Sequence, residues 1–483
     1  MRLIATALAA ACIASAHAAT IPASAFAERN QFSDATLSPD GKHIAVNVRT
    51  KRGDRDVPTL TIYSLPDLKI VSQMGLKGYE MMFAIEWVSN ERLVAHKAME
   101  IGLREAPAAT GEIVAMDLNG SHFEYLYGYN MFKSSSRGKQ YMNDYGHGSV
   151  ARVPIEKNDH VFVSAYDWEG AKSRVFDINS RTAVRKELAN LSEEGFDFVL
   201  QDDGTPRFAY GSDNDDNPVL YRADARDAWK KLPNDLARDL LPFGIQPDNK
   251  SSFAWLSKNN GPRALARYDL ATGATTVLGS DPFASVGRLE WSFGARSVPI
   301  AWHAATGKPT VTYIDPADPD AQIHKMLAAQ FPGLDLYIIN DTLDGKKLLF
   351  WVGSDRDPGS YYLFDRTSGK ADLLFSNLPN IDPEQMAERR PIRYTARDGL
   401  TIEGYLTLPA NPTHKKLPLI VMPHGGPIGP RDTWYFDSDA QFLASRGYAV
   451  LQPNFRGSGG RGKAFQEAGF RQWGGKMIDD MVD

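Results

Sequence analysis

The chain has 483 residues, of which 43% are hydrophobic and 23% are charged, and these values are typical of a soluble globular protein with two or three domains. The net charge is -5, from 54 basic and 59 acidic residues, and no block of one sign stands out. This balance argues against nucleic acid or an anionic membrane surface as a partner.

The first eighteen residues have the features of a signal peptide. Arg2 is followed by an apolar, alanine-rich run from Leu3 to Ser15, and Ala16 to Ala18 fits the small-x-small cleavage rule. The apolar run is too short to span a bilayer, and no other span is evident. We therefore expect cleavage after Ala18 and export to the periplasm or outside of a bacterium.

Cys12 is the only cysteine and lies inside this segment. Cleavage after Ala18 would leave a mature chain without cysteine, which excludes disulfides, thiol catalysis and thiolate metal sites. The alternative is that Cys12 is a bacterial lipidation site. The preceding Ala9 to Ala11 fit that signal poorly, because a leucine is expected three residues before the cysteine.

A turn followed by an alternating strand recurs between residues 30 and 380. In Ser38 to Lys42, proline presets φ, aspartate bonds its own backbone and glycine accepts a positive φ, and His43 to Val48 then alternate. Weaker copies of the turn are found at residues 201–204, 246–250 and 343–347.

A second repeated feature is an apolar strand that closes on an aspartate. It ends at Asp117, Asp177, Asp224, Asp269, Asp315 and Asp365, and Thr61 to Leu65 fit one step earlier without the aspartate. Unrelated β-turns would not repeat two features at one period. The spacing is typical of four-stranded propeller blades, so we predict a β-propeller over residues 19–385, with seven blades.

The pattern changes near residue 386, after a turn-rich stretch at residues 377–383. Two alternating arms surround Asp398-Gly399, which predicts a hairpin. Next come a buried strand at Leu417–Met422, a helix over residues 437–446 ended by Gly447, and a strand at residues 448–453. This alternation predicts that residues 386–483 form the N-terminal part of an α/β-hydrolase domain.

His424-Gly425-Gly426-Pro427 directly follows the predicted strand and is the clearest candidate site. Glycines there let the backbone turn sharply and present N–H groups, and in α/β-hydrolases such a loop supplies one of two oxyanion donors. A strand-end turn with incidental glycines is the plainer alternative. We predict Gly425 and Gly426 as the oxyanion loop, organised by His424 and Pro427 rather than using His424 as a base.

The chain contains neither a G-x-S-x-G elbow nor a histidine after His424. In α/β-hydrolases the order is serine, acid, histidine, so we expect the nucleophile, acid and base to lie outside these residues and the chain by itself to be inactive. The glycine-rich run at residues 454–462 lacks the phosphate-loop pattern. H-E-x-x-H spacing is also absent, so no metal and no cofactor are predicted.

Together these motifs resemble the prolyl oligopeptidase family of serine peptidases, in its acylaminoacyl-peptidase and dipeptidyl-peptidase-like branch. The motifs that carry the resemblance are residues 397–399 with 402–404, 424–427, 454–458, and 473–475 with 479–480. The resemblance implies hydrolysis of short peptides, a propeller that filters substrates by size, and the Gly426 N–H as an oxyanion donor. Arg461 departs from it, because the family usually has tyrosine there.

Two other functions remain open from the sequence. The chain could be a non-catalytic propeller binding protein, or an α/β-hydrolase esterase of related fold. We also expect residues 386–483 to be poorly packed in isolation and to expose apolar strands such as Leu417–Met422.

Overall fold

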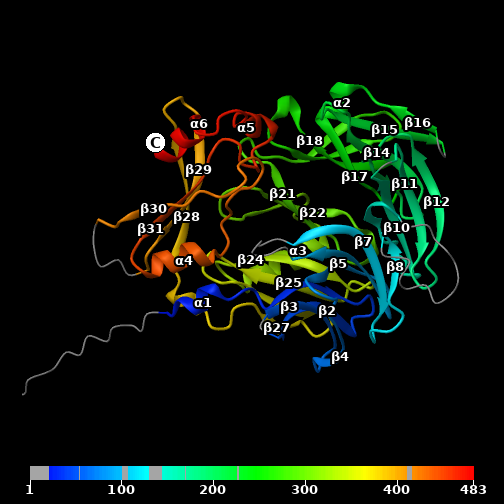
Figure 1. Ribbon diagram of the computed structural model, residues 1–483, viewed down its shortest axis with the longest axis horizontal. Helices are drawn as coiled ribbons and strands as arrows, with labels where there is room; N and C mark the ends of the chain where they lie inside the picture. The colour runs from blue at the N-terminus through cyan, green and yellow to red at the C-terminus, as the bar shows by residue number, and fades with distance from the viewer. Residues whose placement is uncertain are drawn as a thin grey trace, which may run out of the picture.

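The computed structural model describes residues 21–53, 55–100, 107–129, 144–168, 170–225, 228–410 and 416–483. The predicted signal peptide, with Cys12 and the cleavage position after Ala18, lies outside the described residues. Figure 1 shows a large ring of strands and, beside it, a smaller sheet built from the C-terminal part of the chain.

Seven antiparallel sheets follow one another along the chain, and in each of them neighbouring strands are consecutive in sequence. The first two are β1 (Phe32–Leu37), β2 (His43–Arg52), β3 (Arg55–Ser64), β4 (Lys69–Met74), and β5 (Glu80–Ser89), β6 (Arg92–Met99), β7 (Ala108–Asp117), β8 (Glu124–Tyr127). The next two are β9 (Gly146–Arg152), β10 (His160–Asp167), β11 (Ser173–Asn179), β12 (Val184–Leu191), and β13 (Asp197–Leu200), β14 (Pro206–Ser212), β15 (Pro218–Ala225), β16 (Ala228–Lys231). The last three are β17 (Leu240–Ile245), β18 (Ser251–Leu256), β19 (Ala264–Asp269), β20 (Thr275–Gly279), then β21 (Val286–Trp291), β22 (Pro299–Ala304), β23 (Val311–Tyr313), then β24 (Asp335–Asp341), β25 (Lys347–Gly353), β26 (Ser360–Asp365), β27 (Lys370–Ser376).

The two sequence repeats occupy equivalent places in these sheets. The turns at residues 38–42, 201–204, 246–250 and 343–347 all connect the first strand of a sheet to its second. The aspartates of the other repeat all lie on the third strand or just after it, as Asp117 does at the end of β7. One repeat of the sequence therefore corresponds to one sheet.

Each sheet packs its apolar face on the next, and the last packs on the first. Leu37 and Ile44 of the first sheet share a buried cluster with Leu349 and Leu363 of the last. The Leu37 N–H also donates to the Asn340 side chain at 2.9 Å. These contacts close a propeller, in which each sheet needs its neighbours for burial. The seven sheets are the number that a seven-bladed propeller requires. The blade count itself stays a prediction.

The C-terminal sheet has the order β28 (Glu388–Thr395), β29 (Thr401–Leu408), β31 (Ala449–Asn454), β30 (Leu419–Val421). β28, β29 and β31 pair antiparallel, whereas β30 and β31 are parallel. The chain between these two parallel strands contains a helix, as the sequence predicts for an α/β unit. The fold expected from the sequence, a propeller followed by the N-terminal part of a hydrolase domain, is thus observed, while the boundary at residue 385 stays a prediction.

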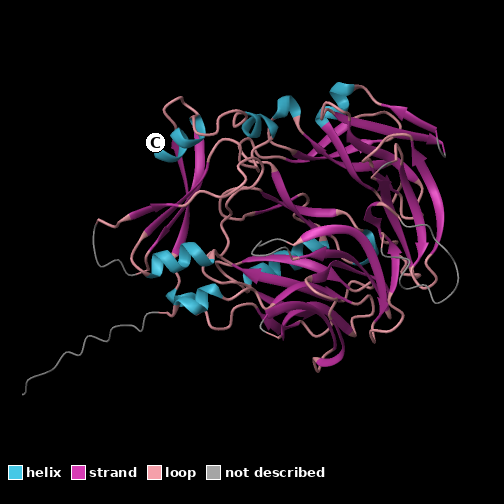
Figure 2. Ribbon diagram, viewed as in Figure 1, coloured by secondary structure: helices cyan, strands magenta, loops and turns pink. Residues whose placement is uncertain are grey.

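Short helices border this sheet, and strands make up most of the ring (Figure 2). The helices of the described residues, in the ring and beside the sheet together, are α1 (Ala23–Ala27), α2 (Asn234–Asp239), η2 (Lys258–Asn260), η3 (Gly294–Arg296), α3 (Pro319–Ala329), η4 (Pro383–Gln385), α4 (Ser438–Ser445), α5 (Lys463–Glu467) and α6 (Lys476–Val482). Asp437 caps α4 by accepting from the Ala440 N–H at 2.9 Å. No helix in the described ranges is long and apolar enough to span a membrane.

The prediction of a buried strand at Leu417–Met422 is wrong in two respects. The strand is only β30, three residues long, and Leu419 and Val421 are 54% and 40% exposed. The physical reason is that β30 pairs on one side only, with β31, among the described residues. An apolar run predicts burial only when another element covers it.

Candidate functional site

The loop after β30 contains two glycines whose backbone N–H groups are exposed. Gly425 and Gly426 are both exposed, and Gly426 has a φ of 133°, a region that favours glycine. Neither N–H group donates a hydrogen bond to any acceptor in the described part of the chain. Two unused backbone donors at the end of a strand are suited to stabilise an oxyanion, and this role stays a prediction.

His424 is held by both ring nitrogens. Its Nδ1 lies 2.8 Å from the Gly425 carbonyl oxygen, and its Nε2 lies 2.7 Å from Ser458 Oγ. Since a carbonyl can only accept, Nδ1 donates the hydrogen bond to the Gly425 oxygen. The ring also stacks on Phe455, with centroids 4.5 Å apart. These contacts are those of a residue that fixes the loop.

Two loops lie side by side through backbone contacts. Gly429 pairs with Ser458 in an isolated bridge, and the Gly429 N–H donates to the Gly457 carbonyl at 2.9 Å. The Gly459 N–H donates to the Pro430 carbonyl at 3.2 Å. Pro427 precedes this contact and is half-buried. The motif at residues 454–459 therefore supports the glycine loop.

Arg456 connects this region to α6 and the β28–β29 hairpin. Its guanidinium is bidentate to Asp398, at 2.8 and 3.0 Å, and also contacts both Asp480 oxygens, at 2.8 and 2.6 Å. Asp480 is fully buried. The hydrogen bonds from Arg456 hold the pKa of Asp398 well below its ordinary value. Residues that are distant in sequence thus meet at one planar cation.

A cavity of about 1690 Å³ lies between the propeller and the C-terminal sheet. The propeller side is formed by the first strand regions of several sheets, including Asp34, Arg288 and Tyr337. The other side is formed by residues within 429–439 and 459–466, in the loops after β30 and β31 and in α4 and α5. Gly425 and Gly426 do not line it, but the continuation of their loop at Gly429 does.

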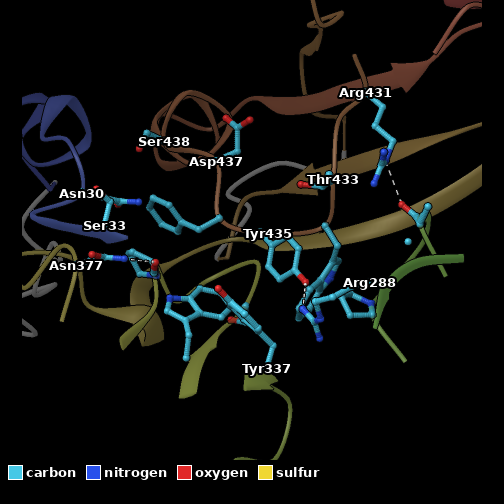
Figure 3. A pocket seen from close by; sticks show the side chains of 18 of the residues that line it. Asn30, Ser33, Arg288, Tyr337, Asn377, Arg431, Thr433, Tyr435, Asp437 and Ser438 are labelled. Atoms are coloured by element: carbon cyan, nitrogen blue, oxygen red, sulfur yellow. Dashed lines mark hydrogen bonds between the residues drawn. The ribbon is translucent and has the colours of Figure 1, made fainter. Parts of the chain in front are cut away.

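Tyr435 joins the two walls of this cavity. Its hydroxyl donates to Asp335 at 2.6 Å and accepts from Arg288 at 3.1 Å. Figure 3 shows Tyr435 pointing toward Arg288. Burial raises the pKa of Tyr435. Burial alone would raise the pKa of Asp335, but hydrogen bonds and the charge of Arg288 outweigh it and lower that pKa. The three groups form a charged contact between the domains.

Behind Arg288 lies a second layer of buried polar groups. Arg288 Nε donates to Glu290 at 3.0 Å, and His303 Nε2 lies 3.1 Å from the same carboxylate oxygen. His324 is fully buried, and burial lowers its pKa. These residues belong to the propeller alone, so their arrangement holds Arg288 in place.

Arg461 replaces the tyrosine expected from the resemblance, and its surroundings explain how it fits. Its guanidinium lies over Phe465 at 3.9 Å and over Phe283 of the propeller at 4.0 Å. It also donates to the Thr401 carbonyl at 2.5 Å. Burial lowers the pKa of Arg461 to about 10. A planar cation between two aromatic rings occupies this place and contacts both domains.

Sequence reasoning found the glycine loop and missed the cavity residues. Arg288, Asp335 and Tyr435 come from three distant segments, and none lies in a recognisable motif. Arg431 follows the glycine loop by only four residues, and this proximity was the one sequence signal that pointed to a cavity residue. No group of three His, Cys, Asp or Glu side chains arranged to hold a metal occurs in the described ranges.

A family match and a set of similar proteins agree on the family of this chain. Residues 434–483 match the prolyl oligopeptidase family. The chain is 33% identical over 353 residues to dipeptidyl aminopeptidase BIII of Pseudoxanthomonas mexicana. The aligned region covers 69% of this chain and 49% of that protein. It is 33% identical over 173 residues to dipeptidyl peptidase family member 6 of Caenorhabditis elegans, covering 32% of this chain and 23% of that protein. The chain thus spans about half the length of the first of these relatives.

Solved structures share the fold. A prolyl endopeptidase structure superimposes with a TM-score of 0.64 at 12% identity, covering 95% of this chain and 67% of that one. A puromycin hydrolase superimposes with a TM-score of 0.62 at 17% identity, covering 95% and 71%. These structures show the shared fold. The match of residues 434–483 to the family and the 33% identity to dipeptidyl aminopeptidase BIII over 69% of this chain show that the chain belongs to the prolyl oligopeptidase family.

Proposed function

We propose that the protein acts as a serine peptidase that hydrolyses short peptides in the cavity between its two domains. The observation that carries the proposal is the pair of unused N–H groups at Gly425 and Gly426, on a loop that continues into the cavity wall at Gly429. Such donors stabilise the charge that develops on a carbonyl oxygen during acyl transfer. The relatives named as dipeptidyl peptidases support peptides as substrates.

The cavity supports a short peptide rather than a compact small molecule. Its volume of about 1690 Å³ exceeds the roughly 300–1,000 Å³ of ordinary small-molecule pockets. The propeller encloses it on one side, so a folded protein would be excluded while an extended peptide could enter. This arrangement agrees with the size-filter role that the family resemblance implies.

The nucleophile, acid and base are assigned to sequence outside these 483 residues, since the chain has no G-x-S-x-G and no histidine after His424. The first test is to read the source DNA past codon 483. We expect a G-x-S-x-G, then an aspartate or glutamate, then a histidine. A frame without these residues would overturn the serine mechanism and favour the non-catalytic binding protein.

The activity test compares two chains on two substrates. The 483-residue chain should not hydrolyse an aminoacyl anilide, and the same chain extended through its reading frame should. The extended chain should prefer the anilide over a short acyl ester. Preference for the ester would support the esterase instead, and turnover by the 483-residue chain would contradict the assignment of the triad.

Export through the segment at residues 1–18 is part of the proposal. Fractionation of a bacterial host that expresses the chain should place it in the periplasm or medium, with an N-terminus at Ala19. Retention in the cytoplasm with Met1 intact would contradict it, and a lipid on Cys12 would support the lipoprotein alternative.

A further inference from the structure

The cavity is lined by several cationic side chains, and most of them are neutralised. Arg49 pairs with Glu100 at 2.9 Å, Arg288 pairs with Asp335 at 2.7 Å, and Lys463 lies 3.6 Å from Glu467. Each of these charges therefore has a partner before any ligand enters.

Arg263 and Arg431 are the exceptions. Both line the cavity, and neither lies within ion-pair distance of a carboxylate in the described residues. Arg263 uses Nε to donate to the Val286 carbonyl at 3.0 Å, and Arg431 uses Nε to donate to the Ala305 carbonyl at 3.1 Å. The Nη groups of both side chains donate to no acceptor in the ranges described, so the forked ends of both guanidinium groups are unused.

A short chain of contacts ties the two arginines together across the domain boundary. The Arg263 N–H donates to Ser285 Oγ at 3.1 Å, and the Ser285 N–H donates to the Gly460 carbonyl at 2.8 Å. Gly460 lies against Arg431, since a Cβ added to it would be 3.1 Å from Arg431 Cδ. Arg263 comes from the propeller and Arg431 from the glycine-loop segment, so a ligand here touches both domains.

The surroundings fix both guanidinium groups in advance. Arg263 lies over the Trp255 ring at 4.6 Å, and Figure 3 shows Arg431 anchored by its bond across the cavity edge. Burial and the nearby positive charge of Arg431 lower the pKa of Arg263. Two like charges without a counter-ion are unfavourable, and an anionic group between them offsets that cost.

We propose that Arg263 and Arg431 form a binding site for a carboxylate group of a peptide held in the cavity. The guanidinium fork matches the two oxygens of a carboxylate, and two forks from the two domains would fix its position. The inference rests on the proposed function for the nature of the ligand. The carboxylate has two sources, the C-terminus of the peptide or an Asp or Glu side chain.

Binding is measured by isothermal titration calorimetry on the 483-residue chain, so that no hydrolysis is required. Three acetylated probes separate the sources: tetraalanine, tetraalanine amide, and an alanine tetrapeptide amide with one aspartate. We expect one or both carboxylate probes to bind roughly tenfold to a hundredfold tighter than the uncharged amide. Preference for the free acid identifies the C-terminus, and preference for the aspartyl amide identifies a side chain.

The double variant R263Q/R431Q should bring the three probes to equal affinity, because the attraction to charge is lost. R263K/R431K keeps both charges and should keep part of the preference. K463Q is the matched control, since it removes one cavity charge that already has a partner, and it should keep the full preference. Circular dichroism and thermal unfolding verify that the variants are folded.

Equal affinity of the three probes for the unchanged chain would overturn the site, as would a preference that survives in R263Q/R431Q. Inorganic phosphate that competes as well as the carboxylate peptide would overturn its assignment to peptide carboxylates. Failure of the proposed function is distinguishable from these outcomes. It would appear as an extended chain without peptidase activity while carboxylate-dependent binding is intact.

Discussion

At the scale of single residues, the glycine loop differs between its two glycines. A Cβ built on Gly426 would lie 3.0 Å from the Pro430 ring, and its φ of 133° is one that other residues rarely adopt. Gly425 has open space around a Cβ and no positive φ. The same chemical change therefore has different costs at adjacent positions, although the sequence shows two equivalent glycines.

We predict that Gly426→Ala destabilises the chain by about 1–3 kcal/mol, because the backbone must leave its φ region. Gly425→Ala should have no such cost, since an alanine fits there and reduces the freedom of the unfolded chain. Urea denaturation of both variants makes the comparison. Equal stability of the two would show that the loop has no conformational requirement at Gly426.

A second residue-scale prediction concerns Asp479 and Asp480, which are adjacent in sequence and opposite in environment. Asp480 is fully buried against Arg456, whereas Asp479 contacts the exposed Arg397 at 3.0 Å. Asp480→Asn should cost about 3–5 kcal/mol, because it leaves a buried cation short of its counter-charge. Asp479→Asn should leave the denaturation midpoint unchanged. A reversed order would contradict the assigned burial.

At the scale of elements, the end of β24 holds a carboxylate that links it to η3. Asp341 accepts from the Gly294 N–H at 2.5 Å, and burial raises its pKa to about 6. The folded chain therefore binds this proton more tightly than the unfolded chain does. Its contribution to stability is complete below pH 4 and is lost as the pH rises through about 6.

Asp341→Asn should consequently stabilise the chain by about 1–3 kcal/mol at pH 7 and have little effect at pH 4. Asp344→Asn is the control of opposite sign, because side-chain hydrogen bonds from Thr342 and Lys346 lower the Asp344 pKa to about 2. Its loss should destabilise at pH 7, and the difference should vanish as the pH falls through about 4 to 2. Denaturation across pH 2–8 tests both signs.

The sequence predicts the strands, turns and helices of this protein better than it predicts the cavity. The turn at residues 38–42 and the aspartates such as Asp117 mark fixed places in each sheet, because local turn chemistry determines them. The cap of α4 and the hairpin around Asp398 were also predictable from local residues. β30 was not, since burial depends on what covers a strand. The cavity residues Arg263 and Arg431 depend on how two domains meet, which no local pattern encodes.

At the scale of the whole molecule, contacts from two segments of the C-terminal domain hold the domains together. Tyr435 bonds to Asp335 and Arg288, and the Phe436 N–H donates to the Ser354 carbonyl at 2.9 Å. Tyr405 bonds through its hydroxyl to Gly307 of the propeller at 3.1 Å. The cavity exists because these contacts surround it.

We predict that Tyr435→Phe loosens this interface without unfolding either domain. It removes a hydrogen bond to a buried carboxylate, which typically contributes about 1.5–3 kcal/mol. Hydrogen exchange at the Phe436 amide should become faster, while exchange within the propeller strands should not change. Tyr448→Phe is the control, since Tyr448 makes no side-chain hydrogen bond in the described residues. Unchanged exchange at Phe436 would show that Tyr435 does not hold the domains together.

The exposed edge at β30 has a consequence for how this chain behaves in solution. Leu419 and Val421 are presented beside a row of backbone groups that no described strand pairs. Such an edge is a template for another extended segment. Self-association should therefore rise with protein concentration and begin at this edge, and a lysine at position 419 or 421 should suppress it while the propeller keeps its fold.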